Sequence, residues 1–350
     1  MATRKEVARM AGVSEATVSR VLNGVGPIKE ETRKRVLEAA EALDYQLNAV
    51  AASFARGRSG NIGVVLPHVP KVHLFSTYYF AEILSGIGEA VRSGEGGGLL
   101  LLYRNPGEAF DYVSLFRTQR VDACLILGAT SAEPERESIA RLADADAPFC
   151  VVDQRFDEHP GIPAVVADHV GGSYAATRHL LDRGCRRIGF LNGSAQYSNS
   201  LDRLHGYRKA LREAGIDDEE AAPVFEGNYS RKSGYAAAPS VFREMDRLDA
   251  MLCANDRMAI GLIQGLRELG CAFPGRLPIV GYDNSDAAAL FDPPLTTVEV
   301  PFFEMGKLAA RKLLDRLSGG GRDGEVFRET LPTRLVVRKS CQSGEEIERT

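Results

Sequence analysis

The first 24 residues constrain the fold of this chain more than any other segment, because they predict two short helices joined by a tight turn. In the first helix Val7 and Met10 fall on one face, with small alanines beside them. Gly12 breaks the helix, and Ser14 is placed to cap the next one. The apolar positions of the second helix are Val18, Val21 and Leu22. This arrangement is typical of a helix-turn-helix, although an ordinary helical hairpin with a solvated outer face has the same spacing.

A third helix is expected from Lys29 or Glu30 to Leu43, which would complete a three-helix headpiece over residues 1–46. Its predicted apolar face is formed by Val36, Leu37, Ala40 and Leu43. The following segment, 47–60, is rich in small residues and ends in Gly and Arg. An isolated helix of this length is marginal in water, so the segment is interpreted as a hinge that a partner would order.

From Asn61 onwards, short apolar runs alternate with helix-like segments, which is typical of doubly wound parallel sheets in an α/β protein. The first runs span residues 62–67, 99–103, 123–128 and 148–153. The alternation then restarts with runs at 164–168, 187–192, 250–254 and 278–282. Residues 61–350 are therefore expected to form two successive α/β lobes.

Composition supports a multidomain globular protein: 350 residues with 44% hydrophobic side chains can bury a large core. The net charge is −4, yet residues 1–60 hold 10 Lys and Arg against 7 Asp and Glu, so the basic excess coincides with the predicted helix-turn-helix. The six cysteines show no metal-ligand spacing, and we expect neither a metal nor a cofactor. Because the chain shows no leader-like start and no apolar run of membrane-spanning length, we expect a cytoplasmic protein with no membrane partner.

The headpiece residues resemble the head of a lactose-repressor (LacI/GalR) family transcriptional regulator. The matching segments are VA at 7–8, AGVS at 11–14, ATVSRVLNG at 16–24, and ETR at 31–33 continuing through Tyr45 to Asn48. The resemblance extends along almost the whole chain and implies a periplasmic-binding-protein-like core of two lobes joined by three crossing strands. The first crossing is expected near 164–168, and the chain is expected to return through 296–300 and 329–339.

The resemblance places base-reading side chains at Glu15, Ala16 and Arg20. Arg20 can donate two hydrogen bonds to guanine O6 and N7, whereas Ala16 offers only an apolar contact, for example to a thymine methyl group. Glu15 either accepts from a cytosine amino group or faces solvent. Candidates for hydrogen bonds to phosphate are Thr3, Ser14, Thr17, Ser19 and Asn23.

The hinge departs from the family pattern, and its predicted DNA contacts are Ala51 and Phe54. Phe54 stands where family members usually have a Leu that wedges between base pairs from the minor groove, and Ala52 stands where they usually have Arg. An apolar wedge of this kind kinks a duplex by partial unstacking, and Arg56 or Arg58 would supply the minor-groove charge. The alternative is that Phe54 packs against a dimer partner.

Ligands of a two-lobe core are expected at the carboxyl ends of its strands, where Asp168, Asn255 and Asp283 lie. In family terms Arg203 and Asp283 hold ligand hydroxyls or a carboxylate, and Asp168 and Asn255 are accessories. Asp256 is interpreted as the cap of the next helix. The aromatic candidates are Tyr79, Phe80, Tyr229 and Phe302. The alternative for these positions is a helix cap or an interlobe salt bridge.

No nucleophile elbow, Walker loop, zinc-protease motif or dinucleotide fingerprint is present, so we do not expect an enzyme. A solute-binding or sugar-processing protein could use the same two-lobe cleft, but a solute carrier would have no headpiece. The sequence therefore predicts a repressor that binds a near-palindromic double-stranded DNA operator as a homodimer. Its effector is expected to be a small hydroxylated molecule. The family resemblance favours a sugar or a sugar derivative, and a purine-like ligand is the alternative.

Overall fold

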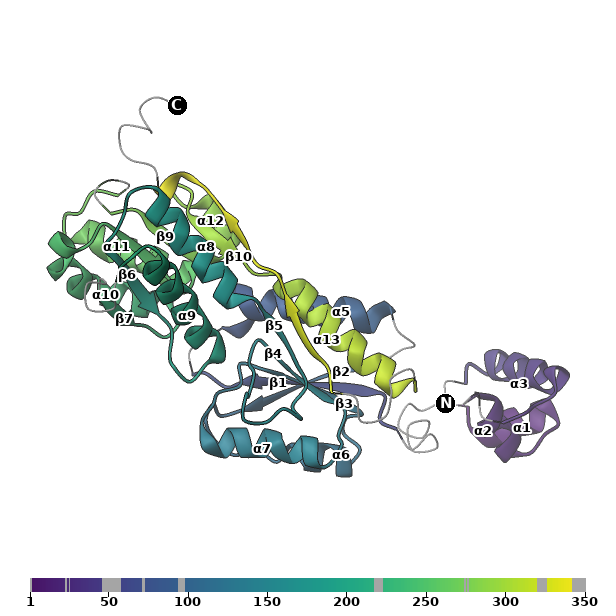
Figure 1. The fold of residues 1–350 in the computed structure, drawn as a ribbon. Helices are drawn as coiled ribbons and strands as arrows, with labels where there is room; N and C mark the ends of the chain where they lie inside the picture. Colours follow the sequence, from purple (N-terminus) through teal and green to yellow (C-terminus); the bar gives the residue numbers. More distant parts are fainter. Residues whose placement is uncertain are drawn as a thin grey trace.

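The computed structural model describes residues 2–22, 24, 26–45, 58–70, 73–93, 98–216, 223–273, 275, 277–319 and 326–341. The N-terminal headpiece consists of α1 (Arg4–Ala11), α2 (Glu15–Leu22) and α3 (Glu30–Ala42), which pack on one another (Figure 1). Their shared core is made of Val7, Ala8, Ala11, Val18, Val21, Val36, Ala39 and Ala40. This core confirms the three predicted helices.

Two apolar residues of the headpiece do not lie on the buried faces predicted for them. Met10 is 57% exposed and Leu37 is 48% exposed. Each lies roughly 100° around its helix from the centre of the buried stripe, because the helix advances about 100° per residue. Small residues fill the interior instead, chiefly Ala8 and Ala11 in α1 and Ala39 in α3.

The first lobe is built on a six-stranded parallel sheet with the order β11-β5-β4-β3-β1-β2. Its strands are β1 (Asn61–Pro67), β2 (Gly98–Arg104), β3 (Ala123–Leu127), β4 (Phe149–Val152), β5 (Ala164–Ala167) and β11 (Arg328–Leu331). One face is covered by α5 (Tyr78–Ser93) and α13 (Phe302–Leu317), and the other by α6 (Tyr112–Arg117) and α7 (Glu133–Asp144) (Figure 1). Cys124 and Cys150 lie fully buried inside strands, as their apolar surroundings predict.

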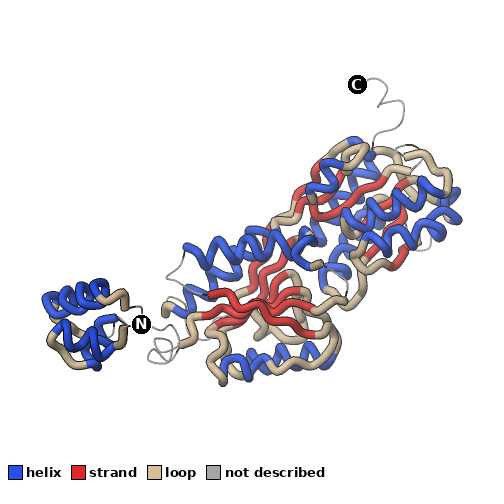
Figure 2. The backbone as a smooth tube through the Cα atoms, turned by 180° about the vertical axis from the view of Figure 1, so that it is seen from behind, coloured by secondary structure: helices blue, strands red, loops and turns tan. Residues whose placement is uncertain are grey.

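The second lobe has a six-stranded sheet with the order β12-β10-β9-β8-β6-β7, parallel except for the β10–β12 pair. Its strands are β6 (Ile188–Asn192), β7 (Val224–Glu226), β8 (Ala250–Cys253), β9 (Ile279–Asp283), β10 (Thr296–Glu299) and β12 (Arg334–Val336). The helices are α8 (His169–Asp182), α9 (Ser198–Glu213), α10 (Arg231–Arg243), α11 (Asp256–Glu268) and α12 (Asp286–Leu290). Three short 3-10 turns complete the described elements, at Leu74–Ser76, Met245–Arg247 and Lys339–Cys341. Figure 2 shows both sheets enclosed by helices.

The chain crosses between the lobes three times, which confirms the predicted connectivity. The crossings run from β5 to α8, from β10 to α13 and from β11 to β12 (Figure 1). The last crossing lies in the predicted segment 329–339, which contributes one short strand to each sheet. All three crossings lie near the carboxyl ends of strands, so they also border the space between the lobes.

Close helix packing in the core depends on glycines. A Cβ atom at Gly86 of α5 would overlap the carbonyl oxygen of Phe303 in α13, and one at Gly306 would overlap the carbonyl oxygen of Ile83. The same kind of overlap would arise in the other two tightly packed helix pairs, α8–α9 at Gly206 and α10–α11 at Gly234 and Gly261. Within the described part of the chain, no helix combines the length and apolarity that crossing a membrane requires.

Candidate functional site

The exposed face of α2 is the first candidate site. Ser14 Oγ accepts a hydrogen bond from the Thr17 backbone N–H at 3.1 Å, so it caps the helix as predicted. Val18 and Val21 point into the headpiece core, whereas Glu15, Ala16 and Arg20 are exposed. A recognition helix needs this combination, because its inner face must hold it rigidly while its outer face meets the bases.

Some of the polar residues predicted to contact DNA are already engaged within the headpiece. Thr3 caps α1 in a capping box with Glu6, and its hydroxyl donates to Glu6 Oε2 at 2.9 Å. Glu15 lies 3.4 Å from Arg4 Nε in an ion pair whose side chains are both about half-exposed. Solvent therefore screens this pair, and Glu15 can exchange it for another partner.

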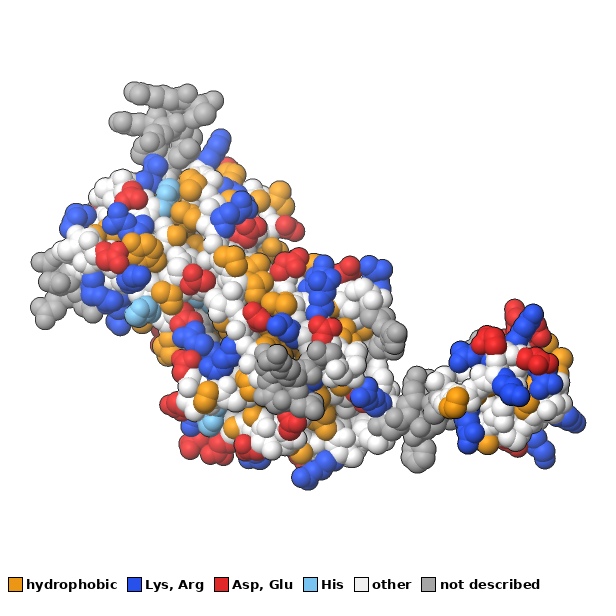
Figure 3. All heavy atoms as spheres, turned by 45° about the vertical axis from the view of Figure 1, so that its right-hand side comes forward, with side chains coloured by type: hydrophobic (Ala, Val, Ile, Leu, Met, Phe, Trp, Pro, Cys, Tyr) orange, Lys and Arg blue, Asp and Glu red, His pale blue; other side chains and the backbone are white. Residues whose placement is uncertain are grey.

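The remaining predicted DNA contacts are distributed unevenly. Thr17 and Ser19 are half-buried on α2, and Ser19 already has an interaction partner within the protein. Asn23, Ala51 and Phe54 lie outside the described residues, as does most of the predicted hinge. Figure 3 shows Lys and Arg side chains at several places on the headpiece, with a few acidic side chains among them.

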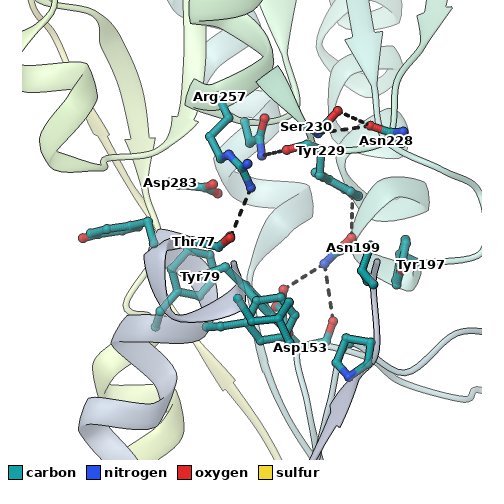
Figure 4. Close-up of a pocket in the computed structure, with 18 of the residues that line it drawn as sticks. Thr77, Tyr79, Asp153, Tyr197, Asn199, Asn228, Tyr229, Ser230, Arg257 and Asp283 are labelled. Carbon is teal, nitrogen blue, oxygen red and sulfur yellow. Dashed lines mark hydrogen bonds between the residues drawn. The ribbon is translucent and has the colours of Figure 1, made fainter. Parts of the chain in front are cut away.

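The second candidate site is a cavity of about 190 Å³ between the two lobes (Figure 4). Its lining includes Pro67 at the end of β1 and Asp153 just after β4 in the first lobe. In the second lobe it includes Asn255 just after β8 and Asp283 at the end of β9. The cavity thus lies at the carboxyl ends of strands from both sheets, where α/β proteins place their ligands.

Three residues that line the cavity have a positive φ angle, a backbone conformation that residues other than glycine rarely adopt. The φ angles are 61° at Asp153, 65° at Tyr229 and 102° at Asp283. Such conformations cost of order 1–3 kcal/mol each and persist where the surrounding structure fixes them, often at functional sites. Here they hold two carboxyl groups and a phenol against one cavity.

Asp153 joins the lobes through two buried hydrogen bonds. One carboxylate oxygen lies 2.7 Å from His169 Nε2, and the other accepts from Asn199 Nδ2 at 2.8 Å. Burial opposes ionisation, but the charge and hydrogen bond of His169, the charge of Arg203 and the hydrogen bond from Asn199 outweigh it and lower the pKa of Asp153. The carboxylate is therefore ionised and committed to protein partners.

Arg203 of α9 is only 2% exposed, and its guanidinium is poorly matched by protein acceptors. One Nη donates to the Tyr229 hydroxyl at 3.2 Å, and the guanidinium carbon lies 4.3 Å from the centre of the Tyr282 ring. Among the described residues its Nε has no hydrogen-bond partner, and no ion pair joins its guanidinium to a carboxylate. A buried cation in this state favours a ligand that supplies acceptors.

Asp283 lines the same cavity and is 8% exposed. Burial raises the pKa of Asp283 well above its ordinary value of 3.8, and the charge of Arg203 opposes this only in part. In the described structure no direct hydrogen bond joins it to Arg203, so the two residues that the resemblance pairs face the cavity separately.

The predicted aromatic residues form the cavity wall. The ring centres of Tyr79 and Phe302 are 5.1 Å apart, and those of Tyr79 and Phe80 are 4.8 Å apart, all edge to face. Tyr229 lines the cavity from the second lobe and donates from its hydroxyl to Asn199 Oδ1 at 2.8 Å. A wall of rings beside a few fixed polar groups is typical of small-molecule sites.

Two residues of this region make contacts other than the ones predicted for them. Asp168 is exposed and lies away from the cavity lining, because its carboxylate caps α8 by accepting from the Gly171 N–H at 2.8 Å. Asp256 does not cap α11; Asn255 does, since it has the extended backbone of a cap and accepts from the Met258 N–H at 2.8 Å. Asp256 instead accepts from the Ser285 N–H at 2.8 Å and from the Thr297 hydroxyl at 2.6 Å.

Several further residues line the cavity that sequence reasoning does not identify. They are Asp153, Tyr197, Asn199, Asn228, Ser230 and Arg257. The sequence could have indicated Asp153, because it ends the predicted apolar run 148–153 in the way that Asp283 directly follows the run 278–282. Arg257 lies in the first turn of a helix whose cap follows a strand, and this position indicates that it faces the carboxyl end of the sheet.

A three-helix headpiece with an exposed polar helix face, followed by two lobes around a small-molecule cavity, defines a ligand-binding transcriptional regulator. Two family models match the chain: bacterial regulatory proteins of the lacI family over residues 3–48, and a periplasmic binding protein-like domain over residues 177–341.

The similarity to known repressors extends over the whole chain. It is 34% identical over 345 residues to the HTH-type transcriptional repressor PurR of Photobacterium profundum, an alignment that covers 98% of this chain and 99% of that protein. A lac repressor dimer bound to operator and the anti-inducer ONPF superimposes with a TM-score of 0.81 at 28% identity, covering 98% of this chain and 99% of that one. A transcriptional regulator CelR–cellobiose complex superimposes with a TM-score of 0.71 at 30% identity, over 97% of this chain and 100% of that one. The chain therefore belongs to the lacI family of bacterial regulatory proteins.

Proposed function

We propose that this protein is a transcriptional repressor that binds a near-palindromic operator through α2. A small effector that binds between the lobes would lower or raise its affinity for the operator. The observation that carries the proposal is the exposed face of Glu15, Ala16 and Arg20 in a chain that is 34% identical to a helix-turn-helix repressor over 98% of its length. A repressor acts where the chromosome is, so we place its action in the cytoplasm and assign it no catalytic activity.

On DNA, Arg20 would fork onto a guanine in the major groove, and Ala16 would contact a neighbouring base through its methyl group. Ser14, Thr17, Ser19 and Asn23 would donate to phosphates and set the register of the helix without reading sequence, and Thr3 would do so by exchanging its hydrogen bond to Glu6 for one to a phosphate. Ala51 and Phe54 of the hinge would enter the minor groove, with Phe54 as the wedge.

Effector binding would act through the contacts that join the lobes. A ligand in the cavity contacts residues of both lobes, such as Tyr79 and Phe302 in the first and Arg203 and Asp283 in the second. Its binding energy therefore favours one relative arrangement of the lobes over another. By linkage, an effector that changes operator affinity must have its own affinity changed by operator to the same degree.

Assembly as a homodimer is supported by an apolar stripe on the edge strand β2. Leu99, Leu101 and Tyr103 are 40%, 39% and 48% exposed and lie on the same side of the strand. A second copy would cover these side chains and would bring two headpieces to the two half-sites of a palindrome.

Selection of duplexes from a random library by the purified full chain tests the DNA function directly. We expect enrichment of a pseudo-palindrome, and release or tightening when a panel of sugars and nucleobases is added. Arg203→Ala should abolish the response to ligand while leaving operator binding without ligand intact, and Arg178→Ala on the surface of α8 is the matched control. Enrichment of no symmetric site would contradict the proposed function.

A further inference from the structure

We propose that the effector of this protein carries an anionic group, a carboxylate or a phosphate on a small hydroxylated molecule, and that Arg257 together with Arg203 binds it. The inference rests on the proposed function, because it takes the interlobe cavity as the effector site. It names the chemical class of the ligand and assigns Arg257 as the specificity-determining residue.

Arg257 comes from the first turn of α11 in the second lobe and lines the cavity. Its Nη1 donates to the Thr77 hydroxyl across the lobe boundary at 3.3 Å, a long bond to a neutral acceptor. In the described structure no ion pair joins it to a carboxylate, and Figure 4 shows its side chain extending towards Thr77 with Asp283 to one side. Burial lowers the pKa of Arg257, which is the expected effect on a cation that has lost water without gaining a counter-ion.

The cavity therefore contains two guanidinium groups without carboxylate partners. Arg203, which is only 2% exposed, also leaves its Nε without a hydrogen-bond partner among the described residues. The two carboxyl groups on the lining do not balance them. Asp153 is committed to His169 and Asn199, and Asp283 lies where burial disfavours its charged form. With Asp153 ionised and the charged form of Asp283 disfavoured, two guanidinium cations face one carboxylate, and a ligand that brings a negative charge would offset the difference.

Helix dipoles add to this surplus. The caps of two helices line the cavity, Ser230 for α10 and Asn255 for α11, and Thr77 directly precedes α5. The three helices are 13, 13 and 16 residues long, so each presents the positive end of a full-length dipole. Helix N-termini beside unpaired guanidinium groups form a site for an anion rather than for a neutral ring.

The remaining lining residues suit a small hydroxylated molecule that carries this anionic group. Asn199, Asn228 and Tyr197 offer donors and acceptors suited to hydroxyl groups, and the rings of Tyr79 and Phe302 offer an apolar face. A volume of about 190 Å³ limits the ligand to a small molecule. Sugar acids and sugar phosphates share this chemistry, and a neutral sugar would leave both guanidinium groups unpaired.

The anion site is tested by thermal unfolding of the full chain with inorganic phosphate, compared with chloride at the same ionic strength. Phosphate also stabilises proteins non-specifically, so the measured quantity is the difference between variants. Arg257→Gln should lose the extra rise in unfolding midpoint, and Arg257→Lys should keep part of it. Arg243→Gln, on an exposed position of α10, should keep all of it. Equal rises in the wild type and in Arg257→Gln, or no extra rise in the wild type, would overturn the proposal.

Calorimetric titration with glucose, gluconate and glucose 6-phosphate identifies the source of the charge. We expect an acidic member to bind at least about tenfold more tightly than glucose, as a charge-assisted hydrogen bond implies, and Arg257→Gln to remove that preference. Tighter binding of glucose would overturn the inference. Release of operator DNA by neutral ligands alone would leave the repressor function standing and reject the anionic effector. Failure to bind any operator would reject the repressor function while the phosphate measurement still decides the anion site.

Discussion

Asp153 Oδ1 lies 2.7 Å from His169 Nε2, and both side chains are 1% exposed. Asp153 follows β4 in the first lobe, and His169 begins α8 directly after the first crossing to the second lobe. The other oxygen of the same carboxylate accepts from Asn199 of α9. One buried carboxylate therefore ties the first lobe to two helices of the second lobe beside the interlobe cavity.

Replacing Asp153 by Ala should lower the free energy of unfolding by about 2–4 kcal/mol, because His169 and Asn199 would be left buried without their acceptor. Urea unfolding followed by circular dichroism measures the change. Asp182→Ala removes a carboxylate from the exposed Arg178–Asp182 pair and should cost less than about 1 kcal/mol. Equal losses for the two variants would show that the Asp153 contacts do not stabilise the fold.

Gly86→Ala should destabilise the protein by about 1–3 kcal/mol or more, because the added methyl group would overlap the Phe303 carbonyl oxygen where α5 crosses α13. Gly88 lies two residues further along the same helix, and a Cβ atom there would meet nothing within 4 Å. Gly88→Ala should therefore be neutral or stabilising by up to about 1 kcal/mol, since alanine favours helix. Thermal unfolding of the two variants side by side checks the contrast, and a stable Gly86→Ala protein would contradict the packing.

Much of the fold could be predicted from the sequence because periodicity reports burial directly. The fully buried strands β1, β3 and β4 are continuous apolar runs, so their predicted bounds agree with the structure almost to the residue. The strand β7 is short and partly exposed, and it carries no such run, so nothing in the sequence predicts it. The face of a short helix is also weakly determined, and Met10 and Leu37 are predicted inside although valines and alanines fill that core.

The candidate site was predicted less completely, for a different physical reason. Arg203 and Asp283 follow motifs that the resemblance carries, and both line the cavity. Whether a polar residue at a strand end faces a ligand or caps a helix depends on one backbone turn. That turn sends Asp168 to the Gly171 N–H and Asn255 to the Met258 N–H. Arg257 reaches Thr77 across a distance of 180 residues in sequence, and no local pattern reports such a contact.

Arg20→Ala should weaken operator binding by about 1–3 kcal/mol and relax the preference at one guanine of each half-site. Binding isotherms on the selected operator and on a set of single-base variants measure both effects. Arg35→Ala, at an exposed position of α3, makes the same change in charge and should leave the base preferences unchanged. Uniform weakening across all duplexes would identify Arg20 as a phosphate contact instead.

The two carboxyl groups of the cavity should give stability opposite dependences on pH. Because the folded pKa of Asp283 is raised, the folded chain holds its proton more tightly than the unfolded chain does. The free energy of unfolding that depends on Asp283 is therefore greatest below the ordinary pKa of 3.8 and declines as pH rises through the folded pKa. The pKa of Asp153 is lowered, so its contribution is present above 3.8 and is lost as pH falls.

Asp283→Asn should accordingly flatten the decline in stability above pH 3.8, by at most about 1.4 kcal/mol per pH unit. Urea unfolding at a series of pH values from roughly 4 to 8 measures the slope for each variant. Asp286→Asn, on the exposed start of α12, is the matched control and should follow the wild-type profile. An unchanged slope in Asp283→Asn would mean that the carboxyl group is solvated in the cavity, and it would remove one reason why the site carries a surplus of positive charge.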